Sequence, residues 1–232
     1  MSNEQRIWNF LLDAIGNQFG VAGLMGNLQA ESGLNPINME NQYEKKLGMN
    51  DSQYTAAVDN GSYTNFVNDA CGYGLAQWTY WSRKQNLYQY AKQLGTSIGD
   101  LQMQLEYLIR ELRGYTTVWN TLLTAKSVKE ASDVVLVQFE RPADQSERAK
   151  QNRANIGQSF FNKYNTLNGD NEVLWSGKVC VNSVLNIRAG AGTNYPAIGG
   201  LVNGTIVGIL EERSNWGRID RGWICLDYVK RL

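Results

Sequence analysis

Apolar residues in the first two-thirds of the chain recur at the three- and four-residue spacing of amphipathic helices. Ser2 and Gln5 stand in capping-box register before the first such stretch, and Gly20 follows it, so we expect a helix from residue 3 to 19. Its apolar positions are Ile7, Trp8, Leu11, Leu12, Ile15 and Phe19. A second helix is predicted from Val21 to about Ser32.

Helical spacing returns in four later stretches, which begin near Ser82, Ile98, Ser127 and Ser146. The third of these has Glu130 in capping-box register with Ser127 and is expected to end before Pro142. Residues 35–72, by contrast, are polar and show no clear period. A structureless connection of this length is uncommon and usually functional.

The period changes to two beyond a short polar linker at residues 165–171. The apolar positions there are typical of strands and are separated by Gly and Asn turns: Val179, Val181, Leu185, Ile187, Ile206, Val207, Ile209 and Leu210. Strands this short in about 60 residues favour a small barrel. We therefore predict an α+β chain of two domains, a mainly helical one at residues 1–166 and an all-β barrel at 173–232.

Composition excludes several kinds of chemistry. The formal net charge is zero, which argues against a general nucleic-acid binder. The chain has no histidine, so it cannot form a Ser-His-Asp triad, a Cys-His peptidase site or a His-ligated zinc site. Cys71, Cys180 and Cys225 form no CxxC pair, and we expect free thiols, none of them catalytic. No metal or cofactor is expected.

Glu31 is the main candidate for chemistry. It shares a helix face with the apolar residues Val21, Leu24 and Leu28, which would place a carboxyl on the apolar side. Burying a carboxylate without a cationic partner raises its pKa. A glycosidase needs such a protonated acid to donate to the departing sugar oxygen. The alternative is that Glu31 simply faces solvent at a helix end.

Two motifs resemble the lysozyme-like superfamily of goose-type lysozymes and lytic transglycosylases. They are Ala-Glu-Ser-Gly-Leu-Asn-Pro at residues 30–36 and Gly-Tyr-Gly-Leu-Ala-Gln-Trp at residues 72–78. Residues 4–164, including Phe-Glu-Arg-Pro-Ala at 139–143, are most similar to the phage tail lysozyme family, which occurs in tail-associated muralytic proteins and endolysins. The last motif departs from the third motif of many transglycosylases.

This resemblance implies that Glu31 is the general acid, that Gln77, Tyr73 and Trp78 line the glycan groove, and that Ser32 also binds the substrate. Sugar rings stack on aromatic faces, and an amide both donates to and accepts from hydroxyl and N-acetyl groups. Tyr73 and Trp78 could equally be core residues. Tyr43, Tyr80 and Trp81 are weaker candidates for the groove.

An inverting hydrolase also needs a base that activates water. Asp69 precedes the Gly-Tyr-Gly turn, and goose-type enzymes similarly place an Asp shortly before their Gly-Leu-x-Gln segment. Asp69 is therefore the candidate base, with Asp51 and Asp59 as competitors in the same loop. It could instead be a turn residue that bonds its own backbone.

Residues 176–232 resemble the bacterial SH3-like domain, on Leu-Asn-Ile-Arg-Ala-Gly at 185–190 and Gly-Trp-Ile at 222–224. Such modules commonly bind peptidoglycan peptides. The residues that this resemblance offers as cell-wall contacts are Asn186, Arg188, Tyr195, Trp216 and Tyr228. Trp223 is expected in the core rather than in a binding groove.

The sequence therefore predicts a lysozyme that cleaves the β-1,4 bond between N-acetylmuramic acid and N-acetylglucosamine, with peptidoglycan bound by both domains. Alternatives are a lytic transglycosylase and a non-catalytic wall-binding virion protein. No signal peptide or membrane span is visible, which fits an endolysin made in the host cytoplasm and released to the wall. Oligomeric state and target bacterium stay open.

Overall fold

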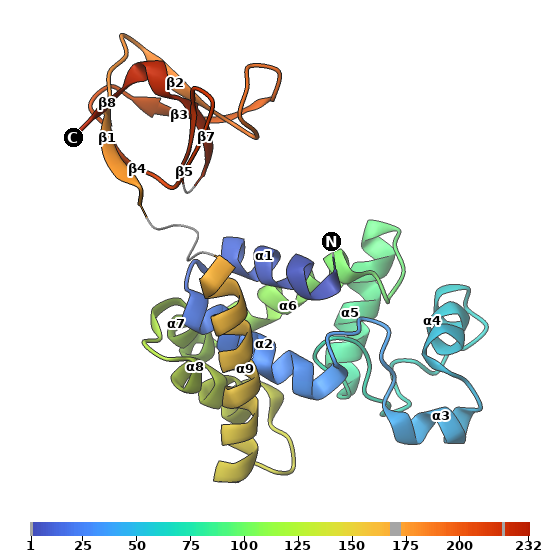
Figure 1. Ribbon diagram of the computed structural model, residues 1–232. Coiled ribbons are helices and arrows are strands. Elements are labelled where there is room, and N and C mark those ends of the chain that lie inside the picture. The colour runs from blue at the N-terminus through green and yellow to red at the C-terminus, as the bar shows by residue number, and fades with distance from the viewer. Residues whose placement is uncertain (1, 168–172, 220) are drawn as a thin grey trace. The chain divides into compact units, whose positions relative to one another are not determined.

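The computed structural model describes residues 2–167, 173–219 and 221–232 (Figure 1). The chain divides into two compact units, one up to Lys163 and one from Tyr164 onward. The first is helical and the second is built of short strands, so the expected two-domain α+β class is confirmed. The predicted linker at residues 165–171 is wrong at its start, because residues 165–167 still belong to the last helix, and its remainder lies outside the described residues. No helix of the described part is long and apolar enough to cross a membrane.

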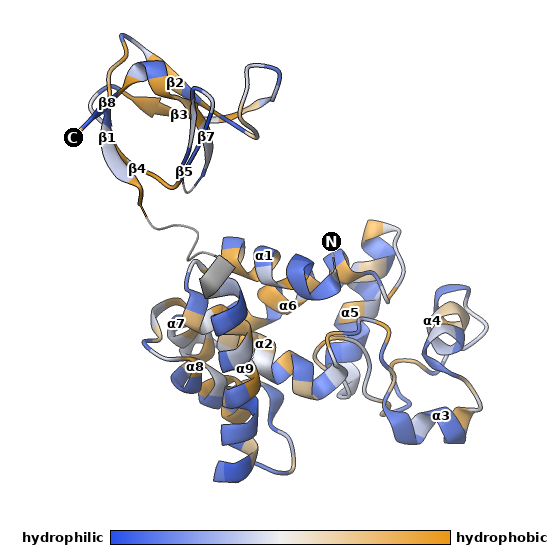
Figure 2. Cartoon of the chain, viewed as in Figure 1, coloured by the Kyte–Doolittle hydropathy of each residue, from blue (hydrophilic) through white to orange (hydrophobic). Residues whose placement is uncertain are grey.

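The first unit is a layered packing of helices. Their bounds are α1 (Asn3–Ile15), α2 (Gln18–Ser32), α3 (Asn41–Leu47), α4 (Asp51–Asp59), α5 (Trp81–Leu94), α6 (Leu101–Gly114), α7 (Thr116–Thr124), α8 (Val128–Val134), the π-helix η1 (Val135–Glu140) and α9 (Glu147–Leu167). Figure 2 shows mainly hydrophilic residues on α3. The predicted helices from Ser82, Ser127 and Ser146 are present as α5, α8 with η1, and α9.

The predicted end of the first helix at Gly20 is wrong. The helix α1 ends at Ile15, because Gly16 adopts the left-handed conformation (φ 71°) and its N–H bonds to the carbonyl of Leu12. Asn17 then caps α2 by accepting from the N–H of Phe19. Phe19 therefore belongs to α2, although its apolar spacing continues that of α1.

The polar region at residues 35–72 is also more ordered than expected, because it contains α3 and α4. The cap of α4 explains how so polar a segment is helical. Asn50 accepts from the N–H of Gln53, whose side chain accepts in return from the N–H of Asn50. A helix that is stabilised at its end needs little apolar periodicity.

The helix α2 runs through the centre of the first unit and is buried over most of its length (Figure 1). Glycines let its neighbours approach its backbone. A β-carbon at Gly23 would lie 2.6 Å from that of Ala131 in α8, and one at Gly26 would lie 2.8 Å from the nitrogen of Gly157 in α9. The side chain of Asn27 links α2 to α8 by donating a hydrogen bond to the carbonyl of Ser132.

The second unit consists of two antiparallel sheets. One has the order β4-β1-β8 and the other β3-β2-β7-β6-β5. The strands are β1 (Trp175–Val179), β2 (Val184–Arg188), β3 (Ala197–Val202), β4 (Ile206–Ile209), β5 (Glu211–Arg213), β6 (Trp216–Ile219), β7 (Gly222–Cys225) and β8 (Val229–Arg231), with the 3₁₀ turn η3 (Leu226–Tyr228). Alternating residues such as Leu185 and Ile187 fill the core between the sheets, as the period of two predicts.

The close packing of α2 against α9 can be tested at Gly26. The Gly26→Ala protein is expected to be less stable by about 1–3 kcal/mol, because the added methyl group overlaps the backbone of Arg153 and Gly157 in α9. Chemical denaturation measures the loss. The matched control is Gly114→Ala, where no heavy atom lies within 4 Å of the new methyl group. Equal stability of the two variants would contradict the close approach of α2 and α9.

Candidate functional site

Glu31 lies in the last turn of α2, which Gly33 ends in the left-handed conformation (φ 63°). Its carboxylate reaches the surface, with 18% of the side chain exposed, and forms an ion pair with Arg153 of α9 at 2.5 Å. Arg153 also donates to the side-chain oxygen of Asn27 at 3.3 Å. The expectation that Glu31 has no cationic partner is therefore wrong, because α9 supplies one.

A second carboxyl lies near this pair. Glu140 is the last residue of η1, which packs against α2. Its Oε1 is buried and has no hydrogen-bond partner in the described part of the protein. Burial raises the pKa of Glu140 to about 8, and the negative charge of Glu31 adds to the rise. Both effects favour the neutral form of this carboxyl.

A third carboxylate, Glu111 of α6, accepts hydrogen bonds on both of its oxygens. Arg83 of α5 donates to both of its oxygens, at 2.6 and 2.8 Å, in the bidentate geometry of strong ion pairs. The indole N–H of Trp78 donates to the same carboxylate at 2.9 Å. This contact explains how a fully buried Trp78 satisfies its polar atom, and it ties the 72–78 loop to α5 and α6.

The loop at residues 72–78 is held directly against α2. The hydroxyl of Ser32 donates to the carbonyl of Leu75 at 2.9 Å, and Gln104 of α6 accepts from the N–H of Leu75. Gln77 has a positive φ of 43° and donates to both oxygens of Asn38. Ser32 and Gln77 therefore shape the loop beside Glu31 through contacts within the protein.

Burial revises the predicted glycan contacts. Tyr73 and Trp78 are both 0% exposed, so they are core residues and not groove residues. Ser32 is also buried, and Gln77 is half-buried. The accessible aromatic residues are Tyr80 and Trp81, which are 63% and 55% exposed. They line a shallow hollow of about 460 Å³ together with Val67, Asn68, Ala70 and Thr79.

Asp69 is placed where a water-activating base does not fit. Its side chain is only 3% exposed and forms an ion pair with the fully buried Lys84 at 2.5 Å. It also accepts from the hydroxyls of Tyr54 and Tyr63, at 2.6 and 3.0 Å, and from the N–H of Cys71. Four donors saturate this buried carboxylate, which leaves little room for a water molecule to activate. The geometry therefore favours a structural role for Asp69 over the expected role of general base.

The two competing aspartates are likewise engaged. Asp51 accepts from the N–H of Met39 at 2.9 Å, and Asp59 accepts from the N–H of Ile98 at 2.9 Å. Tyr43 lies on the short helix α3 beneath the ammonium of Lys46. These contacts stabilise the 35–72 region, and none of them involves Glu31.

The thiol of Cys71 is also unsuited to catalysis. It is buried, and burial raises its pKa to about 11, which keeps the thiol protonated at neutral pH. Cys71, Cys180 and Cys225 are all free. Among the described residues, no group of three or more acidic, cysteine or histidine side chains is arranged to hold a metal ion.

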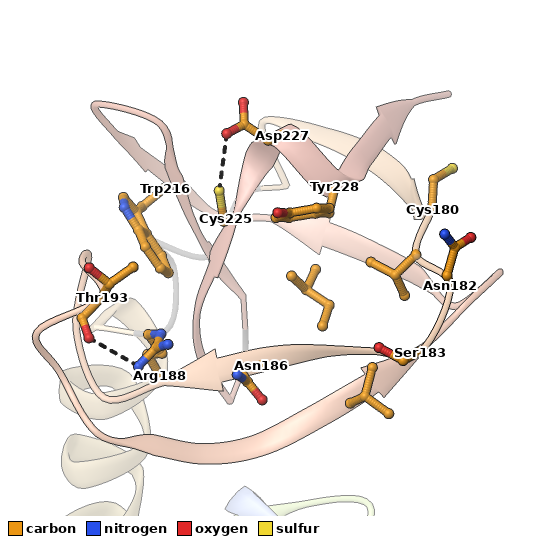
Figure 3. A pocket seen from close by; sticks show the side chains of 13 residues that line it. Cys180, Asn182, Ser183, Asn186, Arg188, Thr193, Trp216, Cys225, Asp227 and Tyr228 are labelled. Atoms are coloured by element: carbon orange, nitrogen blue, oxygen red, sulfur yellow. Dashed lines mark hydrogen bonds between the residues drawn. The ribbon is translucent and has the colours of Figure 1, made fainter.

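The second unit has a pocket of about 610 Å³ (Figure 3). Four of the five predicted wall contacts, Asn186, Arg188, Trp216 and Tyr228, line it. Figure 3 shows Trp216 and Arg188 at one end, with Tyr228 and Asn182 toward the other. Lining residues that the sequence did not single out include Asn182, Ser183, Thr193 and Asp227.

The remaining aromatic residues of this unit lie elsewhere. Tyr195 is 44% exposed but is not among the residues that line the pocket. Its carbonyl accepts from Arg188 at 2.7 Å, so it helps to hold that guanidinium. Trp223 is buried, as expected for a core residue, and Arg213 stacks over its ring.

Comparison with known proteins agrees with this architecture. Residues 2–164 match the family model of the phage tail lysozyme, and residues 183–230 match that of the bacterial SH3 domain. The chain belongs to the phage tail lysozyme family, with a bacterial SH3 domain after the helical unit. It is 29% identical over 160 residues to morphogenesis protein 1 of Bacillus phage B103. That match covers 64% of this chain but only 37% of the phage protein's length.

Sequence reasoning missed two residues whose charges interact with Glu31, namely Glu140 and Arg153. Glu140 stands in the quoted Phe-Glu-Arg-Pro-Ala segment, and its acidic side chain at a predicted helix end was the available signal. Arg153 offered no comparable signal, because basic residues are ordinary on the polar side of a helix, and this helix also carries Arg148 and Lys150. Its contact with Glu31 spans 122 residues of sequence.

The role of Asp69 can be tested by Asp69→Asn. We expect a loss of stability of about 3–5 kcal/mol, because the substitution leaves the buried Lys84 ammonium without its counter-charge. Chemical denaturation measures this loss, with the exposed Asp13→Asn as the control. A stable Asp69→Asn protein whose glycan-cleaving rate falls by about 100-fold would instead support the base role.

Proposed function

We propose that this protein is a muramidase that cleaves the β-1,4 bond between N-acetylmuramic acid and N-acetylglucosamine of peptidoglycan, with Glu31 as general acid. The observation that carries the proposal is the partly exposed carboxyl of Glu31 in the last turn of α2, whose charge acts on Glu140 of the neighbouring η1, a carboxyl with one buried and unpartnered oxygen. Membership of the phage tail lysozyme family supports the same reaction class.

Protonation of the glycosidic oxygen is the step assigned to Glu31. The bond between the anomeric carbon and that oxygen breaks while Glu31 gives its proton to the leaving sugar. The position suits this task, since α2 and the Ser32–Leu75 hydrogen bond fix the helix end and the side chain reaches solvent. The exposed rings of Tyr80 and Trp81 offer the stacking surface for sugars that buried Tyr73 and Trp78 cannot.

Wall attachment is assigned to the pocket of the second unit. Trp216 and Tyr228 provide aromatic faces, while Arg188 and Asp227 provide one charge of each sign. A wall peptide, which carries both amine and carboxylate groups, suits such a lining. The SH3 match of residues 183–230 supports this assignment, and attachment would raise the local concentration of the substrate at the catalytic unit.

The biological setting proposed is lysis of a bacterial host by a phage endolysin. A tail-associated lysin would use the same chemistry and differ in being carried on the virion. A virion protein that binds walls without cleaving them is the alternative of a different class. Loss of turbidity from a suspension of susceptible cells supports an enzyme and contradicts the binding-only alternative.

A lytic transglycosylase is the second candidate function, and the burial of Asp69 favours it. In that reaction the 6-hydroxyl of muramic acid attacks the anomeric carbon, so no water-activating carboxylate is needed and Glu31 can serve as both acid and base. The products carry 1,6-anhydro ends and are one water lighter than those of hydrolysis. Mass spectrometry of digested peptidoglycan separates the two reactions.

The assignment of the general acid can be tested by Glu31→Gln. The rate of peptidoglycan cleavage should fall by at least about 100-fold, because an amide cannot donate the proton to the leaving sugar. Release of soluble muropeptides, followed by mass spectrometry, measures the rate and the product ends together. The control is Glu44→Gln on the exposed face of α3, which should keep the wild-type rate. An active Glu31→Gln would overturn the assignment.

A second prediction concerns wall binding by Tyr228, which is 49% exposed in the pocket. In the Glu31→Gln background, which leaves walls undigested, Tyr228→Ala should weaken co-sedimentation with purified walls by about tenfold or more, as expected for an aromatic anchor. Ile198→Ala removes an exposed side chain of β3 outside the pocket and should bind normally. Equal binding by both variants would contradict the pocket assignment.

A further inference from the structure

Glu140 occupies an unusual position in the helical unit. It ends the six-residue π-helix η1, and Arg141 follows in the left-handed conformation with φ of 52°. The N–H of Arg141 closes the turn by bonding to the carbonyl of Leu136 at 2.9 Å. Short π-helical turns are rare in proteins and occur frequently at functional sites. Here the turn ends on a half-buried glutamate whose Oε1 is buried, and the turn itself packs against α2.

The charges around Glu140 come from four helices. Glu31 of α2 and Glu111 of α6 are negative, while Arg83 of α5 and Arg153 of α9 are positive. Each arginine is already paired with another carboxylate, Arg83 with Glu111 and Arg153 with Glu31. The Oε1 of Glu140 is left buried without a hydrogen-bond partner, which disfavours the charged form of this carboxyl.

The ion pair of Glu31 raises a chemical difficulty that Glu140 resolves. A general acid must carry a proton when the sugar arrives, whereas the contact with Arg153 needs an ionised Glu31. Glu31 and Glu140 act on each other's charge, and carboxyls that do so do not both ionise readily, so one of them tends to keep its proton. The pair as a whole can therefore be a proton donor while Glu31 stays in contact with Arg153.

We propose that Glu140 is a positioning residue for the proton: it keeps one proton on the Glu31–Glu140 pair at neutral pH, and Glu31 delivers it to the glycosidic oxygen. This inference rests on the proposed function. The proton leaves the pair as the bond from the anomeric carbon to the leaving oxygen breaks. In hydrolysis the attacking water loses one proton to the solvent and the solvent returns one to the pair, whereas in transglycosylation the attacking 6-hydroxyl gives its proton to the pair. In both reactions the pair holds one proton again after each turnover.

The pH dependence of cleavage tests the proposal. In the wild type, kcat/KM should fall as pH rises through about 8, where burial and the charge of Glu31 place the pKa of Glu140. In Glu140→Gln the second carboxyl is absent, so this alkaline limb should move by at least about one pH unit toward acid. Cleavage at about pH 8 should then fall by roughly tenfold or more, while cleavage at about pH 5 changes much less.

Two controls separate this role from a structural one. Gln replaces a neutral carboxyl of the same shape, so thermal unfolding at neutral pH should stay close to that of the wild type. Glu140→Asp restores a titratable group and should restore part of the alkaline limb. A folded Glu140→Gln protein with an unchanged pH profile, while Glu31→Gln is inactive, would overturn the inference and leave the proposed function standing.

The protonation of Glu140 can also be measured directly, without an assay of cleavage. Carbon NMR of the glutamate carboxyls should show Glu140 titrating near pH 8 in the wild type. In Glu31→Gln it should titrate at lower pH, because the neutral amide removes the negative charge that adds to the rise. A Glu140 signal that titrates near the ordinary value of about 4.3 would overturn the inference even if the protein cleaves no glycan.

Discussion

The ion pair between Glu31 and Arg153 joins the helices α2 and α9 at the point where the proposed chemistry takes place. Everything around it depends on how closely these helices approach each other. Gly26 in α2 and Gly157 in α9 allow that approach, and Asn27 connects the pair to α8 by bonding Arg153 and Ser132. The pair can form only because small residues remove the bulk between the two backbones.

The same packing explains the neutral acid beside the pair. The helices α2 and α8 are locked together through Asn27, and α8 continues into η1, whose end carries Glu140. The positive charge of Arg83 acts on Glu140. Arg83 itself is paired with Glu111 and stacks on the ring of Phe139. Burial and the charge of Glu31 raise the pKa of Glu140 to about 8, and Arg83 and Arg153, each paired with another carboxylate, offset that rise only in part.

Local patterns in the sequence predicted the fold class and most helices, because spacing and caps are short-range properties. The caps at Ser2 and Ser127 form as expected, and alternating residues of β2 fill the second core. The boundary at Gly16 was missed because the apolar spacing runs on past it. Tyr73 and Trp78 were ambiguous, since an aromatic residue in a loop suits a groove or a core equally well.

Long-range contacts decide what the sequence could not. Glu31 was identified from its helix face and from family resemblance, but its partner lies on another helix, far along the chain. Asp69 lies in the segment expected to hold the base, but it forms a buried ion pair with Lys84 of α5. In the second unit, four predicted residues line one pocket because β2, β6 and η3 meet there, a convergence that strand patterns alone do not give.

The placement of the sugar is the central claim, and a crystal structure of the Glu31→Gln protein with a peptidoglycan oligosaccharide tests it most directly. The account predicts a glycosidic oxygen within about 3 Å of the residue-31 amide, the reach needed for proton transfer by the native acid. A glycan bound to the helical unit with every glycosidic oxygen far from residue 31 would contradict it.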